Sequence, residues 1–112
     1  MNHARTAHPE HATRARREQL RWLVLYVLSQ FPQVGCNEVS LNYMVGAVEG
    51  LERLTRDELR AAMMYLSERE LVRLEHGDHV IHWHGKLTRV GFDVVEYVVP
   101  CEPGIARPTK VD

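Results

Sequence analysis

The 112-residue sequence has little cysteine and no long apolar run. Its two cysteines, Cys36 and Cys101, are far apart and outside any C-x-x-C spacing. We expect reduced thiols, with a disulfide between them as the alternative. The longest apolar stretch, Trp22 to Leu28, is much shorter than the roughly 20 residues that cross a bilayer. Because the first turns of the chain also lack the apolar segment of a signal peptide, we expect a cytoplasmic protein with no membrane anchor.

An excess of one charge is also missing. Lysine and arginine number 14 against 15 acidic residues, for a net charge of −1. A dedicated nucleic-acid binder is more often basic, so this balance weakens the expectation of tight DNA binding. Residues 1–21, however, hold five arginines and only two glutamates. We predict a disordered basic arm over 1–14, a folded domain over 15–99, and an extended, proline-containing tail over 100–112.

Catalytic motifs are absent as well. The chain has no G-x-S-x-G, no Walker loop, no H-E-x-x-H and no paired cysteine and histidine in the setting of a nucleophile. The sequence therefore predicts a binding module that is not an enzyme and needs no cofactor.

What is present is a clear helical periodicity. Apolar side chains at helical spacing predict three helices, over residues 15–31, 40–49 and 55–69. Gly50 is a plausible end for the second helix. The third has the best start signal, because Thr55 and Glu58 form a T-x-x-E capping box in which each side chain satisfies a backbone donor of the other.

The periodicity then changes from 3.6 to 2 residues at Leu71. Two β-rich runs, 71–76 and 79–84, flank Gly77-Asp78 and predict a β-hairpin. Thr88 is a candidate N-cap, but residues 89–99 are rich in β-branched side chains, so helix and strand stay open there. The fold class is thus mainly α with a small β-hairpin. Its order is that of a winged helix-turn-helix: three helices, a two-stranded wing and a short C-terminal segment.

Two motifs at the end of the chain carry a family resemblance. They are L-T-x-x-G-x-D-V at Leu87–Val94 and P-G-x-x-R-P at Pro103–Pro108. With the passage from 54 to 75, they resemble a family of small winged-helix proteins from Mu-like phages and prophages, often labelled uncharacterised phage proteins or ArsR-type regulators. The resemblance covers about residues 20–108. The segment 98–102 and the histidine-rich wing depart from the family pattern. The resemblance implies a phage origin and a winged-helix fold.

In such a fold the third helix would be the recognition helix. Its predicted outward face has Asp57, Ala61, Met64 and Glu68, which offers few base-reading side chains and two carboxylates that repel phosphate. The alternatives of a DNA surface and a solvated or protein-binding face stay open. If DNA binds, we expect phosphate contacts from Arg16, Arg17, Arg53, Arg56, Arg60, Lys86 and Arg89.

The predicted wing contains four histidines, His76, His79, His82 and His84. Imidazole suits zinc, nickel and copper. On a strand, however, His82 and His84 share a face while His79 points the other way. We therefore predict solvent-exposed wing histidines and no metal site.

Helix 15–31 is apolar on more than its core face, because it also has Trp22, Leu25 and Tyr26. A helix of this kind is buried on two sides. We predict a two-fold homodimer through these three residues. The alternative is burial by the chain's own C-terminal segment around Phe92 and Val95.

Two functions remain. The first is a phage-encoded, dimeric transcriptional regulator that binds double-stranded DNA in the cytoplasm of a bacterial host. The second is a protein-interaction module that reuses the scaffold in phage replication, packaging or assembly, with a phage or host protein as its partner. The fold and the arginines favour the first, and the neutral charge favours the second.

Overall fold

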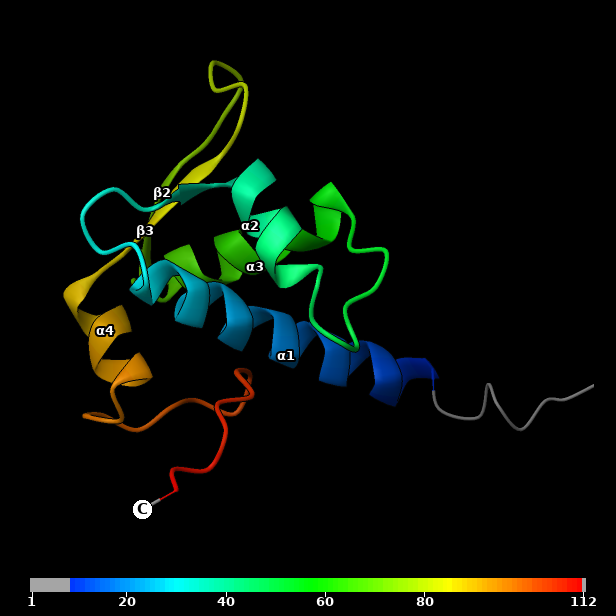
Figure 1. The fold of residues 1–112 in the computed structure, drawn as a ribbon, viewed down its shortest axis with the longest axis vertical. Helices are drawn as coiled ribbons and strands as arrows, with labels where there is room; N and C mark the ends of the chain where they lie inside the picture. Colours follow the sequence, from blue (N-terminus) through cyan, green and yellow to red (C-terminus); the bar gives the residue numbers. More distant parts are fainter. Residues whose placement is uncertain (1–8, 112) are drawn as a thin grey trace, which may run out of the picture.

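The computed structural model describes the backbone of residues 9–111, with side chains from residue 13 onward. Its elements follow in the order α1 (Pro9–Ser29), β1 (Cys36–Asn37), α2 (Glu38–Val45), α3 (Arg56–Glu68), β2 (Val72–Glu75), β3 (His84–Leu87) and α4 (Arg89–Val95). Over these residues the chain forms one mixed domain, with a three-stranded antiparallel sheet in the order β1-β3-β2. The helices α2 and α3 lie on one side of α1, and the C-terminal segment lies on the other (Figure 1).

Helix α1 begins earlier than predicted. Residues 9–14 were expected to belong to a disordered arm, but they are helical; residues 1–8 of that arm lie outside the described part of the chain. Pro9 suits a first helical position, because its φ is fixed there and it has no N–H to leave unpaired. Apolar periodicity missed these turns because residues 9–14 have no large apolar side chain at helical spacing. In Figure 1 the first turn of α1 extends beyond the other helices.

The second helix is shorter than predicted and shifted toward the N-terminus. It begins at Glu38, where the Asn37 side chain accepts a hydrogen bond from the backbone of Ser40 at 2.9 Å. It ends at Val45 with Gly46 as its C-cap, so the prediction of a helix reaching 49 with Gly50 as the cap is wrong. An N-cap asparagine explains the start, since its side chain satisfies a free backbone N–H.

The start of α3 confirms the predicted capping box. The backbone N–H of Glu58 donates to the Thr55 hydroxyl at 3.0 Å, and the backbone N–H of Thr55 donates to the Glu58 carboxylate at 3.1 Å. The inward face of the helix is buried as predicted, through Leu59, Ala62, Met63 and Leu66. The sequence therefore identified both the beginning and the orientation of this helix.

The hairpin exists, but its second strand is not the predicted one. Val72 pairs with Leu87 and Glu75 pairs with His84, so β3 begins where the predicted strand 79–84 ends. Residues 76–83 form a long loop that projects from the domain (Figure 1). Alternation alone therefore predicted the hairpin but placed its second strand too early in the sequence.

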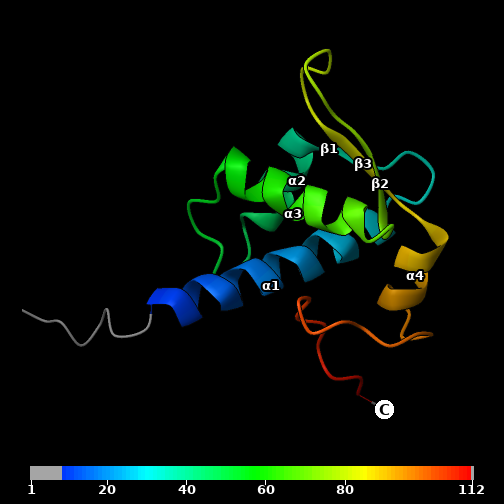
Figure 2. The same cartoon turned by 180° about the vertical axis from the view of Figure 1, so that it is seen from behind.

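The C-terminal segment is part of the core rather than a separate tail. Ile105 is 4% exposed, the backbone N–H of Ala106 donates to the carbonyl of Glu18 at 3.1 Å, and Arg21 donates to the carbonyl of Gly104 at 2.9 Å. The segment passes along α1 on the side away from α2 (Figure 2). The undecided region 89–99 begins as a helix, with Thr88 as its N-cap.

Tyr65 anchors this segment to α3. The guanidinium carbons of Arg21 and Arg69 lie 3.5 and 3.4 Å from the centre of its ring, and its hydroxyl donates to Glu102. A side chain at Gly104 would collide with that hydroxyl. The C-terminal P-G-x-x-R-P motif therefore has a structural role. Its glycine leaves room for the Tyr65 hydroxyl, and the next residue, Ile105, is buried in the core.

Candidate nucleic-acid interface

Glu38, the first residue of α2, joins three parts of the structure. Its carboxylate is almost fully buried and accepts two hydrogen bonds from Arg60 of α3, at 2.7 and 2.6 Å. It also accepts the backbone N–H of Trp83, in the projecting loop, at 2.9 Å. In return the backbone N–H of Glu38 donates to the carbonyl of Trp83 at 2.8 Å. The last residue of the loop, Trp83, is therefore held beside α2 and α3.

The Glu38–Arg60 pair is ionic at neutral pH. The hydrogen bonds from Arg60 hold the pKa of Glu38 below its ordinary value, against the opposing effect of burial. The same bonds raise the pKa of Arg60. The Arg60 guanidinium also lies 4.6 Å from the centre of the Trp83 ring. The bidentate bond of Arg60 to Glu38 positions α3 against α2. The phosphate contact of Arg60 stays a prediction.

Arg16 is also occupied by internal contacts. Its Nε lies 2.7 Å from the Glu58 carboxylate, and its two other nitrogens donate to the carbonyls of Gly50 and Glu52 at 3.0 and 2.9 Å. Arg16 thus ties α1 to the start of α3 and to the turn that precedes it. It holds these elements together, and its DNA contact stays a prediction.

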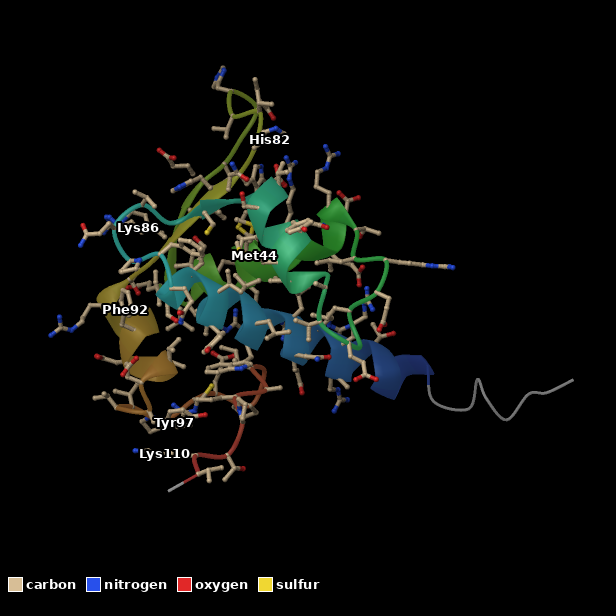
Figure 3. All side chains as sticks on the ribbon, viewed as in Figure 1. Met44, His82, Lys86, Phe92, Tyr97 and Lys110 are labelled. Carbon is tan, nitrogen blue, oxygen red and sulfur yellow. The ribbon has the colours of Figure 1, made fainter. Side chains whose placement is uncertain are left out.

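The other five predicted DNA contacts do not share one face. Arg17 lines a groove with Ala61 of α3, while Arg53 and Arg56 are exposed just before and at the start of that helix. Lys86 lies toward the base of the hairpin, away from the loop residue His82 (Figure 3), and the side chain of Arg89, on α4, is 90% exposed. Only Arg17, Arg53 and Arg56 therefore flank α3.

The outward face of α3 has the composition predicted for it. Asp57, Ala61 and Glu68 are exposed and Met64 is partly buried. Two carboxylates on this face are unfavourable next to phosphate, whereas the small and apolar side chains between them leave room for a close partner.

The wing histidines lie apart from one another in different contacts. The His76 and Trp83 ring centres are 5.1 Å apart, His82 Nδ1 is 3.8 Å from Glu38, and His84 Nδ1 is 3.8 Å from Glu75. Among the residues that the structure describes, no three or more histidine, cysteine or acidic side chains are grouped closely enough to hold a metal ion.

The predicted dimer surface on α1 is only partly on the surface. Leu25 has no exposed area, so its prediction as an interface residue is wrong. Within the chain, α4 packs against α1, and the C-terminal segment bonds to Glu18 and Arg21 of the same helix, which favours the alternative of burial by that segment. Tyr26 remains 47% exposed, with its ring 6.0 Å from the half-buried Trp22.

Two features of the site could not be read from the sequence. Glu38 and Trp83 are 45 residues apart, and neither lies in a motif that predicts their contact. The only local signal is that Glu38 directly follows a good N-cap, Asn37. Acidic residues are favoured at helix starts by the helix dipole alone, so this signal does not indicate the contact with Trp83.

No helix in the described part of the chain has the length and apolar character needed to cross a bilayer. Comparisons with protein-family models, with curated proteins and with solved structures found no match for this chain.

Proposed function

We propose that this chain is a phage-encoded winged-helix protein that binds double-stranded DNA as a transcriptional regulator. The element order, helix–strand–helix–helix–hairpin with the strand order β1-β3-β2, favours a winged helix. The observation that carries the proposal is the Glu38 bridge, because it fixes a projecting loop and the helix α3 as one surface. The phage origin rests on the family resemblance of the two C-terminal motifs.

In this proposal α3 enters the major groove and the loop 76–83 follows the neighbouring backbone. Arg17, Arg53 and Arg56 neutralise phosphates on either side of α3. On the outward face, Ala61 and Met64 offer apolar contact to thymine methyl groups. The carboxylates on the same face repel phosphate, but they accept hydrogen bonds from the amino group of cytosine.

The proposal includes a two-fold dimer. Palindromic half-sites lie about 34 Å apart, and two copies of α3 meet them only when the copies are held at a fixed spacing. Trp22 and Tyr26 on α1 are the part of the predicted dimer surface that remains accessible. Leu25 supports them from the core.

A salt-dependent titration against mixed-sequence duplex DNA tests the proposal. Arg56→Gln should weaken binding to all sequences and reduce the slope of log affinity against log salt by about 1, as the loss of one phosphate contact requires. Lys110→Gln is the control, because it removes an exposed cation from the C-terminal segment, which is outside the predicted DNA contacts. Equal slopes for the two variants, or no salt-dependent binding by the unmodified protein, would reject a DNA surface on α3.

A specific observation favours a second candidate, a non-enzymatic protein-interaction module in phage replication, packaging or assembly. Arg16 and Arg60 are taken up by internal ion pairs, and the outward face of α3 keeps Asp57 and Glu68. A surface of this charge suits a protein partner at least as well as a phosphate backbone. This candidate replaces the first if the titration shows no binding.

A further inference from the structure

A pocket of about 410 Å³ opens between α2, the start of α3 and the projecting loop. Its wall is formed by Val39 and Tyr43 from α2, with the fully buried Leu59 of α3. Most of its lining is apolar, and its volume falls in the lower part of the range that small-molecule sites occupy, about 300–1,000 Å³. The pocket therefore has the size for one small organic molecule.

The charged side chains that line the pocket differ in whether their charge is already neutralised by a partner. Glu38 lines it, but Arg60 and the Trp83 N–H already occupy both of its carboxylate oxygens. Arg56 also lines the pocket, and among the described residues it makes no hydrogen bond or close ion pair. The neutralised Glu38–Arg60 pair thus leaves Arg56 as the net charge, with the His82 imidazole on the facing loop.

We propose that this pocket binds a small organic acid: a molecule with one carboxylate on an aromatic or branched apolar body. The carboxylate meets the planar guanidinium of Arg56, which is suited to bidentate contact with it, and His82 approaches from the loop. The apolar body lies against Val39, Tyr43 and Leu59. A phosphate dianion fits less well, because a single arginine faces it and the buried Glu38 carboxylate lies beside it.

Occupancy of this pocket has a consequence for the proposed DNA surface. The acid contacts Arg56, which is proposed to hold a phosphate, and His82, which belongs to the loop beside α3. Bound acid and DNA therefore compete for the same arginine. This consequence rests on the proposed function, whereas binding of the acid itself does not.

An NMR titration of the full chain with 3-phenylpropanoate tests the pocket, with 3-phenylpropanamide as the neutral probe of the same shape. The acid should give saturable shifts of the backbone amides of Asn42, Tyr43, Leu59 and His82, with a dissociation constant on the order of 10⁻⁴ to 10⁻³ M. The amide should bind at least about tenfold more weakly, because it cannot form the charged contact.

Two variants complete the test. Arg56→Gln should weaken binding of the acid about tenfold while leaving the amide unchanged, and Arg89→Gln should leave both unchanged. No saturable shift up to about 10 mM acid, equal affinity for acid and amide, or equal affinity of the two variants overturns the proposal. Because these readouts contain no DNA, they separate failure of the pocket from failure of the DNA surface.

Discussion

The Glu38 carboxylate lies 2.9 Å from the backbone nitrogen of Trp83, in a loop that the sequence presents as a β-strand. The carbonyl of Trp83 in turn accepts the backbone N–H of Glu38, so both backbone groups of Trp83 face the start of α2. Arg60 holds the buried carboxylate in place. Loop position is therefore set by a side-chain contact across the domain.

Removing the carboxylate should release the loop. In Glu38→Ala the amide of Trp83 should exchange with deuterium several-fold to about tenfold faster, since a hydrogen bond of about 0.5–1.5 kcal/mol is lost. Glu75→Ala, which removes an exposed carboxylate from β2, is the control and should leave that amide unchanged. Unchanged protection of the Trp83 amide in Glu38→Ala would mean that other contacts hold the loop.

Stability should fall with acidification because two carboxylates are paired. Hydrogen bonds from Arg60 and from Arg16 hold the pKa values of Glu38 and Glu58 below their ordinary values in the folded protein. Their contribution is therefore complete above the ordinary carboxyl pKa of about 4.5 and is lost as pH falls through the lowered values.

Urea unfolding between about pH 7 and pH 3 measures this effect. Glu58→Gln should be less stable than the unmodified protein at pH 7 and should lose less stability on acidification, since one of the two groups no longer titrates. An identical pH dependence in the two proteins would show that the Arg16–Glu58 pair does not couple folding to protons.

The C-terminal segment should contribute to stability like any other part of the core. Ile105→Ala should lower the free energy of unfolding by about 2–5 kcal/mol, the usual range for truncating a buried aliphatic side chain. Val111→Ala is the control, because Val111 is 90% exposed, and should change stability by less than about 0.5 kcal/mol. Denaturant unfolding gives both values; a loss under about 1 kcal/mol for Ile105→Ala would place this segment outside the cooperative core.

A substitution at Tyr26 tests the proposed dimer without disturbing the fold. Tyr26→Glu adds a charge to an exposed position of α1 and should convert the dimer to a monomer without unfolding it. Light scattering of the unmodified protein at high micromolar concentration is the first measurement. A monomer there removes the dimer from the account, and a dimer that survives Tyr26→Glu moves the interface elsewhere.

Local signals predicted α3 well. The capping box at Thr55 and the apolar spacing of α3 act within a few residues, so they can be read along the chain. The errors arose where contacts between residues far apart in the sequence determine the structure. Leu25 looked like surplus apolar surface because part of its core, such as Ile105, lies 80 residues away in sequence. The alternation of 79–84 is present in the sequence, but residues 76–83 form a loop and β3 begins only at His84.

The sequence predicted which residue types the candidate site contains, but it did not predict which of them lie together on one surface. Seven cations were identified by charge alone, and charge does not distinguish Arg60, bound to Glu38, from Arg56, which faces a pocket. Distinguishing them required knowing which acidic side chains each could reach. The pocket itself depends on three elements that are separate in sequence, so no single motif indicated it.

The most direct test of the account is to map where duplex DNA touches the protein. Amide spectra recorded during addition of mixed-sequence duplex should show the largest shifts along α3, at Arg53 and Arg56, and in the loop 76–83. The segment 100–111, on the opposite side of α1, should stay unchanged (Figure 2). Shifts confined to that segment, or none at DNA concentrations near about 10⁻⁴ M, where even non-specific binding is seen, would contradict a DNA-binding surface on α3 and the loop.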